Sequence, residues 1–235
     1  MIGTVLLGAV LLFALAAVFA ETQGKTNEGK ICAALTSVAA LCAAAALFAA
    51  ILSDDFSYNY VVSYSSIDLP LLYKISAFWA GQQGSFLLWL VIHAVVGMIL
   101  VQNGRMTATG RGIYHVLTAV LAFLVLIKSP FVPADTIVLD GHGMNPLLQD
   151  PWMAVHPPII FIGYALLAVP FVYSLESMIK APMDAGFLAP MRRWTLVASA
   201  FLGAGIFIGG YWAYKVLGWG GYWGWDPVEN SSLVP

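Results

Sequence analysis

The sequence predicts an all-α integral membrane protein with about six transmembrane helices. Of its 235 residues, 60% are hydrophobic and only 9% are charged, and the mean hydropathy is +0.85. A soluble domain carries roughly 25% charged residues. Spanning helices need about 20 apolar residues, and the charge-free runs that suit them are 2–20, 31–53, 75–104, 112–127, 152–175 and 194–214. The sequence lacks the repeated segments of alternating polar and apolar residues that are typical of a membrane β-barrel.

Two of these runs need interpretation before they count as spans. Residues 2–20 end on Val18-Phe19-Ala20, which resembles the cleavage site of a signal peptide. The run lacks the positive n-region of such peptides and is long enough to span, so we expect the first helix here. The run 75–104 is too long for one span, and its Gly-Gln-Gln-Gly at 81–84 is expected to separate an interfacial segment from a span over 86–101.

Charge distribution predicts that the N-terminus lies outside. With that orientation the inner loops are 21–30, 102–111 and 179–193, and they carry seven of the ten basic residues. The outer segments carry eight of the twelve acidic residues. Basic residues favour the cytoplasmic side of a membrane, so both the N-terminus and the final segment are placed outside. The sequence contains no basic cluster, so a nucleic-acid partner is not expected.

The first external segment is expected to be partly extended. Residues 53–74 alternate polar with aromatic or β-branched residues, as a short extended stretch does. Residues 74–85 suggest an amphipathic element at the membrane surface, with Phe78 and Trp79 as interface anchors.

The second external segment, 129–158, contains a histidine beside two prolines. Asn145-Pro146 and Asp150-Pro151 each look like an N-cap followed by proline in the first helical position. Proline disfavours helical backbone in the preceding residue. Pro157-Pro158 therefore predicts that His156 lies at the outer mouth of the fifth span on a stiff extended link.

The last segment is the most informative. Residues 219–225 read Trp-Gly-Gly-Tyr-Trp-Gly-Trp and are followed by Asp226-Pro227. Aromatic rings offer flat apolar faces with a polar edge, and glycine allows a ligand to approach the backbone closely. Such a surface suits haem, although aromatic residues also gather at membrane interfaces. Asp226 and Glu229 fit the capping box of a short helix better than an acid–base pair.

Four histidines could bind iron, because neutral imidazole is a standard haem ligand. His156 is placed on the same side as the tryptophan-rich segment, where it is either a ligand or a satisfied loop residue. His93 lies near the middle of the third span; it contacts haem or a quinone, or else bonds to a neighbouring helix, and we favour the helix. His115 and His142 are expected to be solvated or interfacial. No two histidines have the spacing of a metal site, and no group of residues stands out as a catalytic nucleophile with its base.

Three motifs in order carry a family resemblance. The stretch 219–232 resembles the tryptophan-rich "WWD" motif of the haem-handling superfamily, and its Asp-Pro-Val-Glu-Asn version is similar to the CcmF-type cytochrome c haem lyase family and its nitrite-reductase-specific relatives. The CcsA branch fits less well. Residues 71–89 resemble that family's segment before its third span, and residues 145–158 resemble its outer loop with the first external histidine.

The resemblance implies that haem is held outside and joined through its vinyl groups to cysteine thiols of apocytochrome c. His156 would be an axial ligand of the haem iron. The other haem-binding positions would be Trp219, Gly220, Gly221, Tyr222, Trp223, Trp225 and Asp226. The implied partners are a haem chaperone, apocytochrome c, other maturation subunits of the membrane, and a C-terminal continuation or partner chain that supplies the second ligand. The implied location is the bacterial inner membrane, with the haem site on the periplasmic face.

We therefore expect residues 1–235 to form a single polytopic domain with external segments 53–85, 129–157 and 213–235. It would be the N-terminal part of a longer or split protein, acting within a holocytochrome c synthase with no catalytic residue assigned. Two alternatives stay open. A haem transporter or channel subunit would use the same aromatic surface, whereas a b-type membrane cytochrome would need two histidines deep in the membrane.

Overall fold

The chain is built from helices. The computed structural model describes residues 2–104, 106–136, 138–179, 188–218, 221–225 and 227–234, and this part of the chain contains no strand, only an isolated bridge between Tyr58 and Pro133. Six helices are long and apolar enough to cross a membrane: α1 (Ile2–Thr22), α2 (Thr26–Leu52), α5 (Gln82–Gln102), α6 (Ala108–Ile127), α7 (Pro151–Ile179) and α8 (Leu188–Val216). The short ones are α3 (Asn59–Tyr64), α4 (Leu71–Ala77), η1 (Pro146–Leu148) and α9 (Pro227–Ser232). The predicted fold class is confirmed; the orientation in the membrane stays a prediction.

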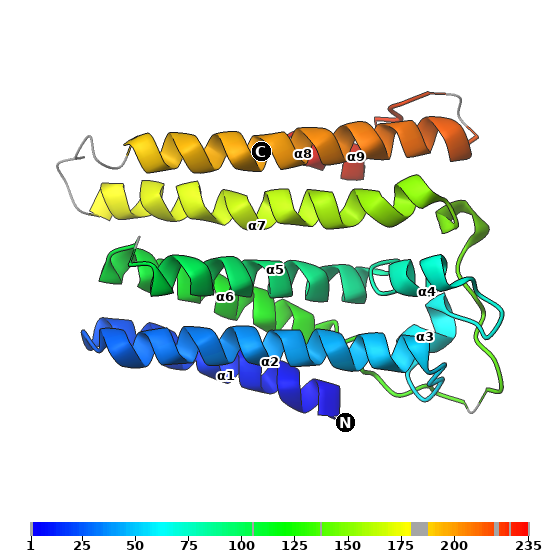
Figure 1. Cartoon of the computed structure of the whole chain (residues 1–235), viewed down its shortest axis with the longest axis horizontal. Coiled ribbons are helices and arrows are strands. Elements are labelled where there is room, and N and C mark those ends of the chain that lie inside the picture. The colour runs from blue at the N-terminus through cyan, green and yellow to red at the C-terminus, as the bar shows by residue number, and fades with distance from the viewer. Residues whose placement is uncertain are drawn as a thin grey trace.

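The long helices lie side by side in three pairs. Figure 1 shows α1 with α2 along one side, α5 with α6 in the middle, and α7 with α8 along the other side. Helix α1 also contacts α6, and α5 contacts both α2 and α7. Helix α8 packs chiefly on α7 and is the least buried of the six.

Small residues allow the helices to approach closely. Ala14 and Ala17 of α1, and Ala40 and Ala43 of α2, are fully buried. Association of helices in lipid depends on such close contacts, because lipid tails are as apolar as the side chains and give little hydrophobic drive. An α-helix bonds most of its backbone groups within the segment, which is why helices suit a membrane.

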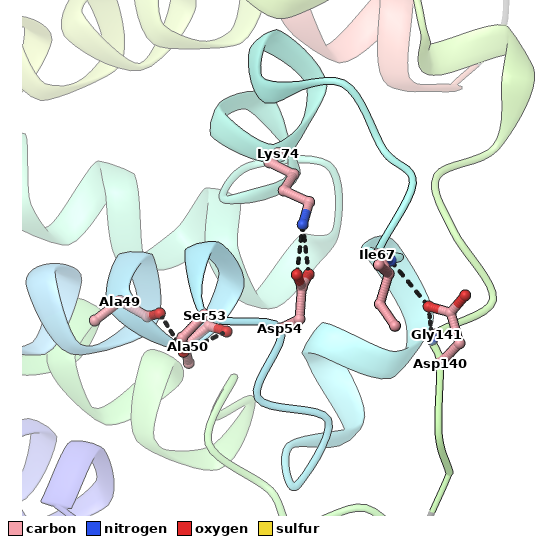
Figure 2. Close-up of polar contacts among 8 residues, drawn as sticks. All are labelled: Ala49, Ala50, Ser53, Asp54, Ile67, Lys74, Asp140 and Gly141. Carbon is pink, nitrogen blue, oxygen red and sulfur yellow. Dashed lines mark hydrogen bonds and ion pairs between the residues drawn. The ribbon is translucent and has the colours of Figure 1, made fainter.

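One end of the bundle carries the long connections, and we call it the loop-rich end: the described residues of segments 53–81, 128–150 and 217–234. Lys74 of α4 forms an ion pair of 2.6 Å with Asp54 just after α2. Asp140 accepts hydrogen bonds from the backbone N–H groups of Ile67 (2.9 Å) and Gly141 (2.7 Å), so the first two connections are tied together (Figure 2). The first two connections are therefore bonded to each other at this end of the helices.

The expected extended stretch over 53–74 is wrong for its central part, which forms α3. Tyr60, Val61 and Val62 of this helix are buried. Three consecutive residues cannot all face one side of a strand. Tertiary burial has therefore overridden the local alternation.

Phe78 is not an interface anchor, as the sequence suggested, but a core residue only 2% exposed. The carbonyls of Ala77 and Phe78 each accept a 2.9 Å hydrogen bond from the hydroxyl of Tyr60, which itself accepts from Gly81 N–H at 3.1 Å. Burial raises the pKa of Tyr60, so its hydroxyl stays protonated and can donate. The chain turns sharply here, and α5 begins at Gln82, close to where the Gly-Gln-Gln-Gly break was predicted.

At the opposite end a buried ion pair joins α1 to α6. Arg111 donates from Nε and Nη2 to the two carboxylate oxygens of Glu21, both at 2.7 Å, and from Nη1 to the carbonyl of Met106 at 2.9 Å. The two side chains are only 8% and 1% exposed. The paired fork geometry satisfies both charges within the fold.

Candidate functional site

A cavity of about 450 Å³ lies between α7 and α8 at the loop-rich end. We call it the α7–α8 cavity. Its walls are mainly aromatic and aliphatic, and one imidazole and two indoles contribute to them. The lining residues are His156, Pro157, Ile160, Phe161, Tyr164, Ile206, Gly209, Gly210, Trp212, Ala213, Leu217, Trp223, Glu229 and Ser231. Its volume and its few polar groups are typical of a site for an organic ligand.

His156 lies inside α7 rather than on an extended link before it. The helix begins at Pro151 and continues through Pro157 and Pro158. The predicted cap is present, because Asp150 Oδ1 accepts from Trp152 N–H at 2.9 Å. The preference against helical backbone before proline is a bias, and here continuation of the helix outweighs it. The position of His156 near the start of the fifth span is as predicted; its backbone conformation is not.

The imidazole of His156 is oriented by α8. Its Nδ1 lies 2.7 Å from the carbonyl oxygen of Gly205. A carbonyl only accepts, so Nδ1 carries the proton and Nε2 keeps its lone pair. Within the described part of the chain, Nε2 has no hydrogen-bond partner.

Gly209 provides the space for this ring. A Cβ added to Gly209 would lie 2.6 Å from Cε1 of His156 and 2.8 Å from its Nδ1. The imidazole therefore lies directly against the backbone of α8, where only glycine leaves room for it.

The described part of the tryptophan-rich segment, 221–225, contributes one side chain to the wall of the cavity. Trp223 lines it, and the buried Nε1 of Trp223 has no hydrogen-bond partner in the described structure. Tyr222 stacks on Tyr214 of α8, with centroids 4.4 Å apart and planes within 8°. The predicted site residues Trp219, Gly220 and Asp226 lie outside the described residues. Of the others in this segment, Gly221, Tyr222 and Trp225 do not line the cavity.

Trp225 is presented to the outside. It is 72% exposed and makes an edge contact with Trp223 at 6.1 Å. Its φ of +57° is unusual for a residue with a side chain. Asn230 Nδ2 donates to its carbonyl at 3.0 Å, and Glu229 Oε2 accepts from Gly224 N–H at 2.6 Å. Helix α9 begins at Pro227 as predicted, and both bonds hold the turn before it.

Two contacts fix the rim of the cavity to the second connection. Lys215 of α8 forms an ion pair with Asp150 at 2.8 Å, although the lysine side chain is 48% exposed. Trp212 Nε1 donates to the carbonyl of Leu147 at 3.2 Å. Leu147 N–H in turn bonds to Asn145 Oδ1 at 3.0 Å, which confirms the second predicted cap.

Sequence reasoning identified His156 and Trp223 but not the rest of the wall. Counting in steps of four along α7 from His156 reaches Ile160 and Tyr164, so helical periodicity could have found them. Gly205 and Gly209 could not be found in this way, because their role depends on the register between α7 and α8.

The other histidines do not join this cavity. His142 is exposed, as expected. His93 is 3% exposed, and so is His115, which corrects the prediction that His115 is solvated or interfacial. The cavity that His115 lines measures about 10 Å³, room for roughly one water molecule. A haem between buried histidines, as in a b-type cytochrome, does not fit there.

No group of three or more His, Cys, Asp or Glu side chains that could hold a metal ion occurs in the described part of the chain. A single imidazole is a weak site for a bare ion. It is sufficient for iron that arrives with its own porphyrin ring of nitrogen ligands. The residues around the α7–α8 cavity therefore fit haem better than a free metal.

Comparison with known proteins agrees with the resemblance. The sequence model of the cytochrome C assembly protein family matches residues 79–235. The cytochrome c-type biogenesis protein ccl1 of Rhodobacter capsulatus is 40% identical over 197 residues, which cover 81% of this chain and 30% of that protein. The cytochrome c-type biogenesis protein CcmF of Pseudomonas aeruginosa is 38% identical over 205 residues, covering 79% of this chain and 29% of that protein.

A solved structure, titled cytochrome c heme lyase CcmF, has a TM-score of 0.80 at 30% identity and covers 98% of this chain. The chain spans 39% of that structure and about three-tenths of the length of the two curated relatives. The sequence matches cover most of the chain and the fold match covers nearly all of it. The chain therefore belongs to the cytochrome c assembly protein family, as a membrane protein of the CcmF haem lyase type.

Proposed function

We propose that this chain holds haem in the α7–α8 cavity while the haem is attached to apocytochrome c. The observation that carries the proposal is the hydrogen bonding of the two ring nitrogens of His156. Its Nδ1–H is committed to Gly205, and its Nε2 is left available in the wall of an aromatic cavity. Metal-binding histidines commonly donate their second nitrogen to a carbonyl in this way.

The aromatic residues would hold the porphyrin plane. Trp223 lines the cavity, while Trp225 makes an edge contact with Trp223 and is an exposed ring on a strained backbone. Strain of this kind at a non-glycine residue is commonly associated with function. By the family resemblance, Trp219, Gly220, Gly221 and Asp226 would complete this platform.

The unpartnered Nε1 of Trp223 is a second reason to expect a ligand with a hydrogen-bond acceptor. A buried indole N–H without an acceptor costs about 1–3 kcal/mol, so the free protein carries a penalty that a ligand with an acceptor would remove. Haem has carboxylate groups that accept hydrogen bonds. A few polar groups in a mostly apolar wall therefore support a ligand that is mostly apolar with a polar edge.

The chain's own part in the reaction would be positioning. In thioether formation the sulfur of an apocytochrome cysteine bonds to a vinyl carbon, and the thiol proton goes to the neighbouring carbon. Holding the vinyl edge near the incoming thiol could lower the barrier by several kcal/mol. No side chain of the cavity is needed as an acid or base, since thiolate character resides in the acceptor cysteine.

The family resemblance supplies the wider setting of the proposal. The loop-rich end would face the periplasm, with the N-terminus outside and the spans in the bacterial inner membrane. A second axial histidine would come from a continuation or partner chain. A haem chaperone would deliver haem, and other maturation subunits of the membrane would complete the assembly.

The test asks whether His156 binds the haem iron in the native assembly, purified from membranes into nanodiscs. The expected result is that His156→Ala loses or shifts the Soret absorption of bound haem, and that added imidazole restores it by filling the vacated space. His142→Ala is the control, because His142 is an exposed histidine at the same end of the bundle. A His156→Ala spectrum equal to the unaltered one, without response to imidazole, would refute the proposal.

A further inference from the structure

A small cavity lies inside the bundle where α2, α5 and α6 meet, and we call it the His115 cavity. It measures about 10 Å³. Its lining residues are Ala33 and Thr36 of α2, Ala94, Gly97 and Met98 of α5, and Tyr114, His115 and Thr118 of α6. A space of this size holds about one water molecule, and any organic ligand is too large for it.

His115 brings to this cavity a polar atom that the fold does not satisfy. The residue is 3% exposed, and its Nε2 is buried with no hydrogen-bond partner in the described part of the chain. A neutral imidazole nitrogen either donates or accepts a hydrogen bond. Because buried polar groups are almost always hydrogen-bonded in native proteins, we look for the partner of Nε2 in the cavity that His115 lines.

Two threonine hydroxyls complete the polar part of the lining. Thr36 and Thr118 are each 2% exposed. Thr36 Oγ1 donates to the carbonyl of Cys32 at 2.8 Å, and Thr118 Oγ1 donates to the carbonyl of Tyr114 at 2.9 Å. Each hydroxyl has therefore used its only proton and keeps lone pairs that accept. A small ligand in this cavity can donate one hydrogen bond to each threonine.

The neighbouring ring of Tyr114 is fixed and cannot turn to fill the cavity. It stacks on His93 of α5 with centroids 4.4 Å apart, and its hydroxyl donates to the His93 carbonyl at 2.9 Å. Gly97 gives it room, since a Cβ there would collide with the ring. His93 itself does not line this cavity, and its Nε2 does not form the bond to a neighbouring helix that the sequence favoured.

The lining favours a water molecule over a metal ion. Its residues include no carboxylate and no thiol, so a bound cation would lack the anionic ligands that it prefers. The carboxylate of Glu21 is already occupied by Arg111, which lies one helical turn before His115 on α6. A buried water needs only two to four polar partners, and the cavity offers three.

We propose that the His115 cavity binds one water molecule, which accepts a hydrogen bond from Nε2–H of His115 and donates to Oγ1 of Thr36 and of Thr118. Three bonds are the usual number for a buried water. Helix α2 packs chiefly on α1 and α5 rather than on α6, so the water would bridge two helices that have little direct contact. The site does not depend on haem binding by His156.

The test is X-ray hydroxyl-radical footprinting of the native assembly in nanodiscs. X-rays convert water into hydroxyl radicals, which oxidise the side chains beside a bound water molecule. Oxidation is expected at Tyr114 and His115 although both are buried. Tyr173 of α7 is the internal control, because it is also buried, at 6% exposed, but lies outside the cavity.

Two sets of variants make the test specific. Thr36→Val combined with Thr118→Val keeps the side-chain shape without the hydroxyls, and oxidation at Tyr114 is expected to be lost. Ser37→Ala is the matched control: it removes a buried hydroxyl of α2 that bonds to the carbonyl of Ala94 at 2.9 Å and does not line the cavity. Oxidation is expected to persist in this control.

A double-mutant cycle in thermal unfolding tests the bridge without any label. Thr36→Val and His115→Phe together should lower the unfolding temperature by less than the sum of the two single losses, because either change removes the same water molecule. The proposal is overturned if Tyr114 and His115 are oxidised no more than Tyr173, if oxidation survives the loss of both hydroxyls, or if the two single losses are additive.

Discussion

The contact between Gly209 and His156 allows the proposed haem site to be tested without removing the histidine. In Gly209→Ala the new Cβ would lie 2.6 Å from Cε1 of His156, so the ring must move by about 0.8 Å to reach the 3.4 Å of ordinary contact. That movement disturbs the 2.7 Å bond from Nδ1 to Gly205. Loss of such an orienting partner typically weakens metal binding about 10- to 100-fold, and we expect this loss of haem affinity.

Stability should change little in the same variant. Alanine in a helix gains roughly 0.5–1 kcal/mol over glycine, which offsets most of a hydrogen bond worth about 0.5–1.5 kcal/mol. The assay is a haem titration of the native assembly, followed by Soret absorption, beside a thermal unfolding curve. Gly203→Ala is the control, because a Cβ on Gly203 of the same helix meets nothing within 4 Å. Equal haem affinity in the two variants would refute the argument.

Two further predictions concern stability. Arg111→Met should cost about 3–5 kcal/mol because it leaves the carboxylate of Glu21 buried and unpaired; thermal unfolding in detergent measures this, and adding Glu21→Leu should restore most of the loss. Failure of the double variant to recover would mean that the pair itself is needed. Gly84→Ala should cost about 3 kcal/mol or more, since its Cβ would collide with the backbone carbonyl of Phe78. Gly8→Ala, with open space around it, is the comparison; equal unfolding temperatures would contradict the packing argument.

The spans could be predicted because lipid imposes a simple requirement on sequence. Their ends could not. The second span was expected from residue 31, yet α2 begins at Thr26 and takes in the polar residues before the apolar run. A helix ends where its backbone finds another partner, not where hydrophobicity stops, so apolar runs give the membrane core of a helix and not its ends.

The loop-rich end was harder to predict because its order comes from contacts distant in sequence. Backbone bonds join Asn59 to Val132 at 2.9 Å and His142 to Val62 at 2.7 Å, and these tie the first connection to the second. Neither pairing has a local signal. Tyr60 was counted as one member of an alternating stretch, whereas its hydroxyl organises the turn before α5.

The candidate site shows the same division between what residue types indicate and what packing decides. A histidine and a group of tryptophans near two helix ends were visible in the sequence, and the structure brings His156 and Trp223 to one cavity. Which nitrogen of His156 is free depends on Gly205, almost fifty residues away on the neighbouring helix. The tautomer of the proposed ligand is therefore set by the register of α7 against α8. A shift of that register by one residue would remove the acceptor from Nδ1 and the space at Gly209 together, so the close packing of these two helices is itself part of the site.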